Sequence, residues 1–149
     1  MLKAFKAANL PQAHLYIAGS GSQEADLKKL RQDLALTDQV TFTGFLTQEE
    51  LRQLYRKMDL AVLSSYSESF PLVLLEAADN LLPLLATDVG GARELIPEGK
   101  GWGVPVNEEK AMADQLRAIA ALPKRRISSN CPNGKSLCPP ALFPGPATG

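Results

Sequence analysis

The chain has 149 residues, of which 45% are hydrophobic and 21% charged, a composition typical of one globular domain. Sixteen basic residues balance sixteen acidic ones, so net charge does not favour a nucleic-acid partner or an anionic membrane surface. No apolar run approaches the length of about eighteen residues that a membrane span needs, and the first residues are too charged for a signal peptide. We therefore expect a cytoplasmic protein without a transmembrane segment.

Strands and helices are expected to alternate along residues 1–122. Apolar spacing and turn residues predict that residues 2–8 are the end of a helix, followed by a strand at 14–18, a helix at 23–36 and a strand at 40–44. A helix is expected after the capping box Thr47-x-x-Glu50, then a strand at 60–63, a helix from 71, a strand at 83–87 and a short helix at 92–96. A turn with at most a short strand is expected at 99–106, and a last helix capped by Asn107 follows it. This alternation indicates an α/β domain with a parallel, Rossmann-like sheet, flanking helices and a ligand at the carboxyl ends of the strands.

The last segment, residues 123–149, has no helical or strand period and is rich in proline. We expect a Pro-rich, irregular tail there. Cys131 and Cys138 both fall in it, and their spacing matches neither a zinc site nor a redox motif, so no metal site is expected from them.

The most informative stretch is S-S-Y-S-E-S-F-P-L-V-L-L-E-A-A at 64–78, where a strand ends and a helix begins at a proline. Pro71 suits the first helical position, because the amide it lacks would have no helical partner there. A helix N-terminus carries unpaired N–H groups and partial positive charge, so it can hold a phosphate or diphosphate. Glu68 precedes the helix and Glu76 lies inside it. We expect a diphosphate at the helix tip, with one carboxylate accepting hydroxyl hydrogen bonds on each side.

The same stretch carries a family resemblance. The run E-S-F-P-L-V-L-L-E-A-A at 68–78, followed by P-L-L-A-T-D-V-G-G at 83–91, resembles the E-x7-E signature of retaining glycosyltransferases of the group 1, or family four, type. These enzymes have two Rossmann-like domains, the GT-B fold. The G-S-G at 19–21, V-T-F-T-G at 40–44 and G-W-G-V near 102 extend the likeness over about residues 1–121. The chain looks like the C-terminal, donor-binding domain, truncated at its N-terminus.

The resemblance implies a role for particular residues. Glu68 matches the catalytic carboxylate near the reacting sugar, and Glu76 matches the carboxylate that binds the ribose. The donor, a nucleotide diphosphate sugar, is implied as substrate, with no metal and no cofactor, in polysaccharide biosynthesis. The other implied donor-binding residues are Gly19 and Gly21 in a turn at the cleft, Gly44, Phe45 and Leu46 against the nucleobase, and Ser69, Phe70, Pro71 and Leu72 facing the sugar and phosphate.

The sequence also departs from the family pattern. We expect an N-terminal acceptor-binding domain to be missing, along with the first, central strand of the donor domain and the following loop with its Arg and Lys. The strands at 14–18 and 60–63 would then either leave a gap or pair directly. Within the signature, Asn80, Leu81 and Leu82 stand where the family has a small residue before its second proline.

Plainer interpretations remain open for these residues. Glu68 could be a solvated turn residue that favours the helix dipole. Glu76 is flanked by apolar residues and needs a partner. His14 is the only histidine and lies in an expected strand, so a structural role is favoured.

Three functions remain open for the whole chain. The first is the donor-binding part of a retaining glycosyltransferase. The second is a nucleotide-sugar-binding module without activity of its own, or one that works only beside an acceptor domain on another chain. The third, less favoured, is another enzyme of similar fold, such as a nucleotide-sugar epimerase, against which the single histidine counts.

Overall fold

The computed structural model describes residues 1–67, 71–96 and 101–122, with the side chains of residues 93 and 95 excepted. Helices and strands alternate along these residues, as the apolar spacing predicts. In chain order they are α1 (Leu2–Ala8), β1 (Leu15–Ala18), α2 (Glu24–Asp33), β2 (Val40–Gly44), α3 (Gln48–Tyr55), β3 (Ala61–Leu63), α4 (Leu72–Asp79), β4 (Leu84–Thr87), α5 (Ala92–Leu95), β5 (Gly101–Val104) and α6 (Glu109–Ala120).

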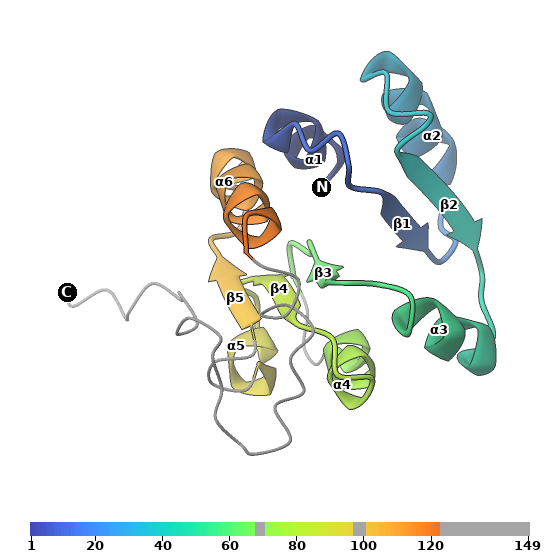
Figure 1. Cartoon of the computed structure of the whole chain (residues 1–149). Helices are drawn as coiled ribbons and strands as arrows, with labels where there is room; N and C mark the ends of the chain where they lie inside the picture. Colours follow the sequence, from blue (N-terminus) through green and yellow to red (C-terminus); the bar gives the residue numbers. More distant parts are fainter. Residues whose placement is uncertain (68–70, 97–100, 123–149) are drawn as a thin grey trace.

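The strands form two parallel sheets rather than one. Strand β1 pairs with β2, with Leu15 opposite Val40. The second sheet has the order β3-β4-β5, and all its pairs are parallel. Figure 1 shows the β1–β2 pair standing apart from this second sheet. The α/β fold with parallel sheets and flanking helices is therefore confirmed, and of the two arrangements that the sequence left open, the separated one is observed.

Helices cover both faces of the sheets. Helices α1, α2 and α6 lie on one side and α3, α4 and α5 on the other (Figure 1). Strand β4 serves both layers because successive side chains of a strand point to opposite faces. Leu85 packs in the cluster of α1 and α6, whereas Leu84 and Ala86 pack in the cluster of α4 and α5. All four residues of β4 are buried.

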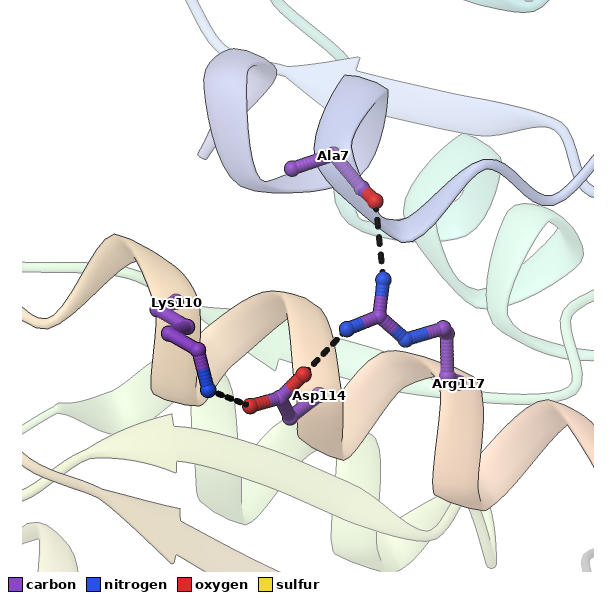
Figure 2. A network of polar contacts seen from close by, with 4 residues as sticks. All are labelled: Ala7, Lys110, Asp114 and Arg117. Atoms are coloured by element: carbon purple, nitrogen blue, oxygen red, sulfur yellow. Dashed lines mark hydrogen bonds and ion pairs between the residues drawn. The ribbon is translucent and has the colours of Figure 1, made fainter.

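The first and last helices are joined by a polar network on their outer side. Arg117 of α6 donates a hydrogen bond of 2.9 Å from Nη1 to the main-chain oxygen of Ala7 in α1 (Figure 2). Arg117 also pairs with Asp114, which accepts a second hydrogen bond of 3.0 Å from Lys110. The hydrogen bonds from Lys110 and Arg117 lower the pKa of the Asp114 carboxyl. This network fixes α1 beside α6 over one face of the sheets.

Three helix starts were predicted from the sequence, and one is confirmed. Thr47 accepts from the N–H of Glu50, whose carboxylate accepts from Thr47, so the capping box at α3 is present. Pro71 is not in the first turn of α4 but precedes it as N-cap, with a non-helical ψ of 84°. Asn107 does not cap α6, because its φ of 63° places it in a left-handed turn that asparagine tolerates, and Glu108 takes the N-cap position.

Candidate active site at the carboxyl ends of the strands

A cavity of about 890 Å³ runs along β1 and β3, from α1 and the start of α6 to the carboxyl ends of four strands. Its lining includes Gly19 after β1, Phe45 and Leu46 after β2, Ser64 after β3 and Thr87 at the end of β4. Carboxyl ends of parallel strands are the usual ligand position in open α/β folds, particularly where neighbouring strands diverge. Three of the residues expected to bind a donor, Gly19, Phe45 and Leu46, are thus brought together at one cavity.

Thr87 links the end of β4 to the segment after β3 at this cavity. Its hydroxyl donates to the main-chain oxygen of Ser65 at 2.6 Å and lies 3.5 Å from that of Leu63. Thr87 is only 7% exposed and ends a strand that is otherwise entirely apolar. The sequence analysis gave no role to Thr87, nor to Ser64 and Ser65 within the stretch 64–78, although the hydroxyl at the end of the run P-L-L-A-T was a usable signal. The bonds hold the segment after β3 against the end of β4.

Two glycine turns at this edge have backbone conformations that favour glycine. Gly19 has a φ of 111° and Gly44 a φ of 69°, and the N–H of Gly19 donates to the oxygen of Gly44 at 2.9 Å. A Cβ at either position would meet no atom within 4 Å, so backbone conformation and not crowding requires glycine. Gly21 is not part of the cavity lining.

Helix α4 begins beside the cavity. Val73, in its first turn, lines the cavity, and Leu72 is 61% exposed. Pro71 is buried and accepts a hydrogen bond from the N–H of Leu74 through its carbonyl. The expected catalytic Glu68, together with Ser69 and Phe70, lies outside the described residues.

Glu76 lies at a different, smaller cavity of about 280 Å³ between α3 and α4. Its Oε1 accepts a hydrogen bond of 3.1 Å from Nε2 of Gln48, the first residue of α3. The partner that a carboxylate on this mostly apolar helix needs is therefore an amide side chain of the neighbouring helix. Arg52, Arg56 and Asp79 also line this cavity. The binding of the ribose by Glu76 stays a prediction.

Tyr55 contributes to the lining of both cavities, as does Leu51. Its side chain is buried, and within residues 1–67, 71–96 and 101–122 its hydroxyl finds no hydrogen-bond partner. Burial, and next the nearby charge of Glu76, raise the pKa of the Tyr55 hydroxyl. Leu51, Leu54 and Met58 share the helical spacing of Tyr55, but they are only partly buried and line the larger cavity.

In the described part of the chain, no group of three or more His, Cys, Asp or Glu side chains is close enough to hold a metal ion. His14 hydrogen-bonds through Nε2 to the hydroxyl of Thr41 at 2.8 Å, a contact between β2 and the residue before β1. None of the described helices is long and apolar enough to cross a membrane.

Solved structures share the fold of this chain. Sucrose-phosphate synthase from Thermosynechococcus elongatus superposes with a TM-score of 0.71 and 33% identity, over 80% of this chain and 33% of that protein. The Anabaena protein HepE, in complex with UDP and glucose, superposes with a TM-score of 0.73 and 25% identity, over 85% of this chain and 36% of that one. These neighbours are GT-B glycosyltransferases, so the fold expected from the sequence is confirmed.

Sequence relatives point to the same class of enzyme. The D-inositol 3-phosphate glycosyltransferase of Nocardia farcinica is 41% identical over 104 residues, 68% of this chain and 23% of that protein. The alpha-D-kanosaminyltransferase of Streptomyces kanamyceticus is 37% identical over 111 residues, 74% of this chain and 29% of that protein. The chain thus spans less than a third of the length of these two relatives. The family model described as glycosyl transferases group 1 matches residues 1–130, and the chain therefore belongs to the group 1 glycosyl transferase family.

Proposed function

We propose that this chain is the donor-binding part of a retaining glycosyltransferase that takes a hexose from a nucleotide diphosphate sugar. The observation that carries the proposal is the cavity at the carboxyl ends of β1 to β4, because it gathers Gly19, Phe45 and Leu46 beside the first turn of α4. UDP-glucose is the first donor to test, since the Anabaena neighbour holds UDP and glucose.

The diphosphate is proposed to sit at the N-terminus of α4. The first N–H groups of a helix lack helical partners and carry partial positive charge, which favours an anion. The same groups would stabilise the charge that develops on the leaving diphosphate, the main electrostatic contribution available here. Pro71 and Leu72 would supply the position, with Ser69 and Phe70 before them.

The nucleobase is proposed to lie against the loop of Gly44, Phe45 and Leu46. The Phe45 ring is 81% exposed at the cavity, which leaves one face free to stack on a base. Stacking of an aromatic side chain on a base contributes about 1–3 kcal/mol. A base stacked on this ring would also remove apolar surface from water, which is favourable.

Glu76 is proposed to accept hydrogen bonds from the ribose hydroxyls. A carboxylate has two oxygens with about four acceptor positions, so the bond from Gln48 to Oε1 leaves capacity for further donors. Reaching the ribose requires the nucleotide to extend from the larger cavity past Tyr55 toward α3. The interaction of Glu68 with the sugar is proposed from the sequence signature.

No metal ion and no cofactor enters the proposal, in which the helix terminus takes the place of a cation at the diphosphate. The acceptor is proposed to be bound by a separate domain, on another chain if need be. The protein is proposed to be cytoplasmic, in the compartment that would supply the nucleotide sugar.

The test is calorimetric titration of the purified chain with UDP, GDP and ADP sugars, after circular dichroism has shown that the chain is folded. We expect saturable binding to one nucleotide class. Glu68→Ala should retain nucleoside diphosphate binding but lose discrimination between the sugar nucleotide and the bare nucleotide. If Glu68→Ala weakens the binding of the bare nucleotide and of the sugar nucleotide equally, the proposed division of roles between the two carboxylates is contradicted.

A second function, binding of a nucleotide sugar without catalysis by the isolated chain, is favoured by the separation of the β1–β2 pair from the other sheet. A donor site built across two sheets depends on their being held in register. A folded chain that binds a nucleotide sugar but hydrolyses and transfers none would support this alternative.

A further inference from the structure

Two aromatic side chains are exposed on the segments that follow β2 and β3. Phe45 follows β2 and is 81% exposed, and Tyr66 follows β3 and is 77% exposed. Both line the larger cavity. Among the described residues, neither ring contacts another ring, and the Tyr66 hydroxyl forms no hydrogen bond. The proposed binding of a nucleotide uses Phe45 and leaves Tyr66 without a role.

Tyr66 differs in this respect from Tyr16, which lines the same cavity. The ring centroid of Tyr16 lies 4.8 Å from that of His14, so its ring already has a partner within the chain. Single exposed aromatic residues are ordinary on protein surfaces, and exposure alone indicates no function. The position of Tyr66 and the attachment of its main chain therefore have to carry the inference.

The main chain next to Tyr66 is held in place. The buried Thr87, at the end of β4, donates a hydrogen bond of 2.6 Å from its hydroxyl to the main-chain oxygen of Ser65. Ser65 immediately precedes Tyr66, so the ring extends from an anchored point. Val73, in the first turn of α4, lines the same cavity. A contact surface that is positioned in advance loses less conformational entropy when a ligand binds.

The two exposed rings belong to different parts of the fold. Phe45 follows a strand of the β1–β2 sheet, whereas Tyr66 follows a strand of the β3-β4-β5 sheet, which stands apart from it (Figure 1). With the base on Phe45 and the diphosphate at the start of α4, the hexose is the part of the donor left for Tyr66. Tyr66 also stands two positions before Glu68, which is proposed to contact the sugar, and two residues of chain span at most about 7 Å.

From these features we propose that the ring of Tyr66 stacks on the hexopyranose of the donor and so favours a sugar nucleotide over the bare nucleoside diphosphate. The C–H face of a pyranose is apolar, and stacking removes this face and one face of the ring from water. The tyrosine hydroxyl can remain in water at the edge of the ring. The inference rests on the proposed function and adds a residue that determines specificity within that site.

The test is calorimetric titration of the wild type and of Tyr66→Ala with UDP and with UDP-glucose, and with GDP and ADP and their glucose derivatives. We expect Tyr66→Ala to weaken the binding of the sugar nucleotide at least about fivefold and that of the bare nucleotide no more than about twofold. Tyr66→Phe keeps the ring and should bind both ligands within about twofold of the wild type. Circular dichroism first checks that each variant is folded.

Two further variants separate the sugar from the base. Phe45→Ala should weaken the binding of UDP and of UDP-glucose by the same factor, since both ligands carry the base. Leu81→Ala is the control for loss of an exposed apolar side chain, because Leu81 is 57% exposed and is not part of the lining of the larger cavity. It should leave both affinities within about twofold of the wild type. No acceptor is present, so a selective loss in Tyr66→Ala comes from the sugar of the donor.

Three results would overturn the inference. If Tyr66→Ala binds both ligands as the wild type does, or weakens both by the same factor, Tyr66 does not contact the sugar. The donor site itself would still stand on wild-type binding and on the loss in Phe45→Ala. If Tyr66→Phe loses as much affinity for UDP-glucose as Tyr66→Ala, the hydroxyl and not the stacked ring makes the contact. A folded wild type that binds none of these nucleotides would overturn the donor site and this inference together.

Discussion

Gln48, the first residue of α3, donates a hydrogen bond of 3.1 Å to the carboxylate of Glu76 in α4. The contact joins two helices of the same layer that flank the smaller cavity. It gives the second carboxylate of the E-x7-E stretch a fixed orientation before any ligand arrives. A preoriented acceptor loses less conformational entropy on binding, which favours affinity.

Replacing Glu76 by alanine should reduce nucleotide affinity by at least about tenfold, or about 1.4 kcal/mol, because hydrogen bonds to the ribose hydroxyls are lost. Gln48→Ala is the matched control, since it removes the contact between the helices and keeps the carboxylate. Its affinity should fall by no more than about threefold. Calorimetric titration with the preferred nucleotide checks both values. Equal losses in the two variants would mean that Glu76 acts by joining α3 to α4 and not by binding the ribose.

Thr87→Val should destabilise the protein and weaken nucleotide binding together. The buried hydroxyl donates to the oxygen of Ser65 at 2.6 Å, and its loss costs about 1–2 kcal/mol of unfolding free energy. The segment after β3 would lose its attachment at the cavity, so affinity should fall as well. Thr43→Val is the control, because its hydroxyl also donates to a main-chain oxygen, that of Gly44 at 3.1 Å, from a more exposed position. Urea unfolding and titration are the measurements.

For Thr43→Val we expect a smaller loss of stability than for Thr87→Val, because water can replace a partner at a partly exposed group. If the two threonine variants lose equal stability and Thr87→Val binds nucleotide normally, the proposed attachment of the segment after β3 has no part in the site.

Tyr55→Phe should stabilise the protein by about 1 kcal/mol, because the buried hydroxyl has no hydrogen-bond partner among the described residues and its desolvation is then avoided. Tyr16→Phe, at a residue that is 40% exposed, should change the unfolding free energy by less than about 0.5 kcal/mol. Urea unfolding at pH 8 measures both. A loss of more than about 1 kcal/mol in Tyr55→Phe would show that the hydroxyl has a partner.

The unfolding free energy should also depend on pH through Tyr55. Burial, and then Glu76, raise the pKa of Tyr55 above its ordinary value of 10.0. Above that value the unfolded chain releases this proton before the folded one does, so the unfolding free energy falls as pH rises. The contribution of Tyr55 is therefore fully present below pH 10 and is lost as pH rises through the folded-state pKa. Tyr55→Phe should lose less stability than the wild type between about pH 9.5 and 11.

Gly101→Ala should be strongly destabilising. A Cβ at this position of β5 would lie 2.4 Å from Cγ2 of Ile96 and 2.7 Å from the main-chain oxygen of Leu84. Since one of these atoms is backbone, relief requires β4 and β5 to move apart, at a cost of about 1–3 kcal/mol or more. Gly21→Ala is the control, because a Cβ there meets nothing within 4 Å and its φ is not positive, and it should change stability by less than about 0.5 kcal/mol. Comparable thermal midpoints for the two variants would contradict this packing.

Local structure could be predicted from the sequence, whereas contacts between residues distant in the chain could not. The capping box of Thr47 and Glu50 and the strand at 40–44 were predictable because caps and apolar runs depend on neighbours in sequence. Asn107 was misassigned because an asparagine can either cap a helix or adopt a left-handed turn, and only the observed φ distinguishes these. The segment at 99–106 was expected to be a turn with at most a short strand, and its four-residue strand β5 is fully buried.

The candidate site shows the same limit. Gly19, Phe45 and Leu46 were predicted together and line one cavity, because strand ends in a parallel sheet share an edge. The role of Thr87 could not be predicted, because its hydroxyl binds the main-chain oxygen of Ser65, 22 positions away in the chain. The sequence also could not decide whether β1 and β3 would pair, since that depends on how the helices of both layers pack around them.

The most direct test of the donor site is to locate the nucleotide on the folded chain. Amide chemical shifts of the isotope-labelled protein can be followed by NMR during titration with UDP and with UDP-glucose. The account predicts saturable shifts concentrated at the amides of Gly19, Gly44, Phe45, Leu46 and Leu72, with weaker shifts along α6. Saturable shifts confined to other surfaces, or none in a folded chain at millimolar nucleotide, would contradict a donor site at the carboxyl ends of these strands.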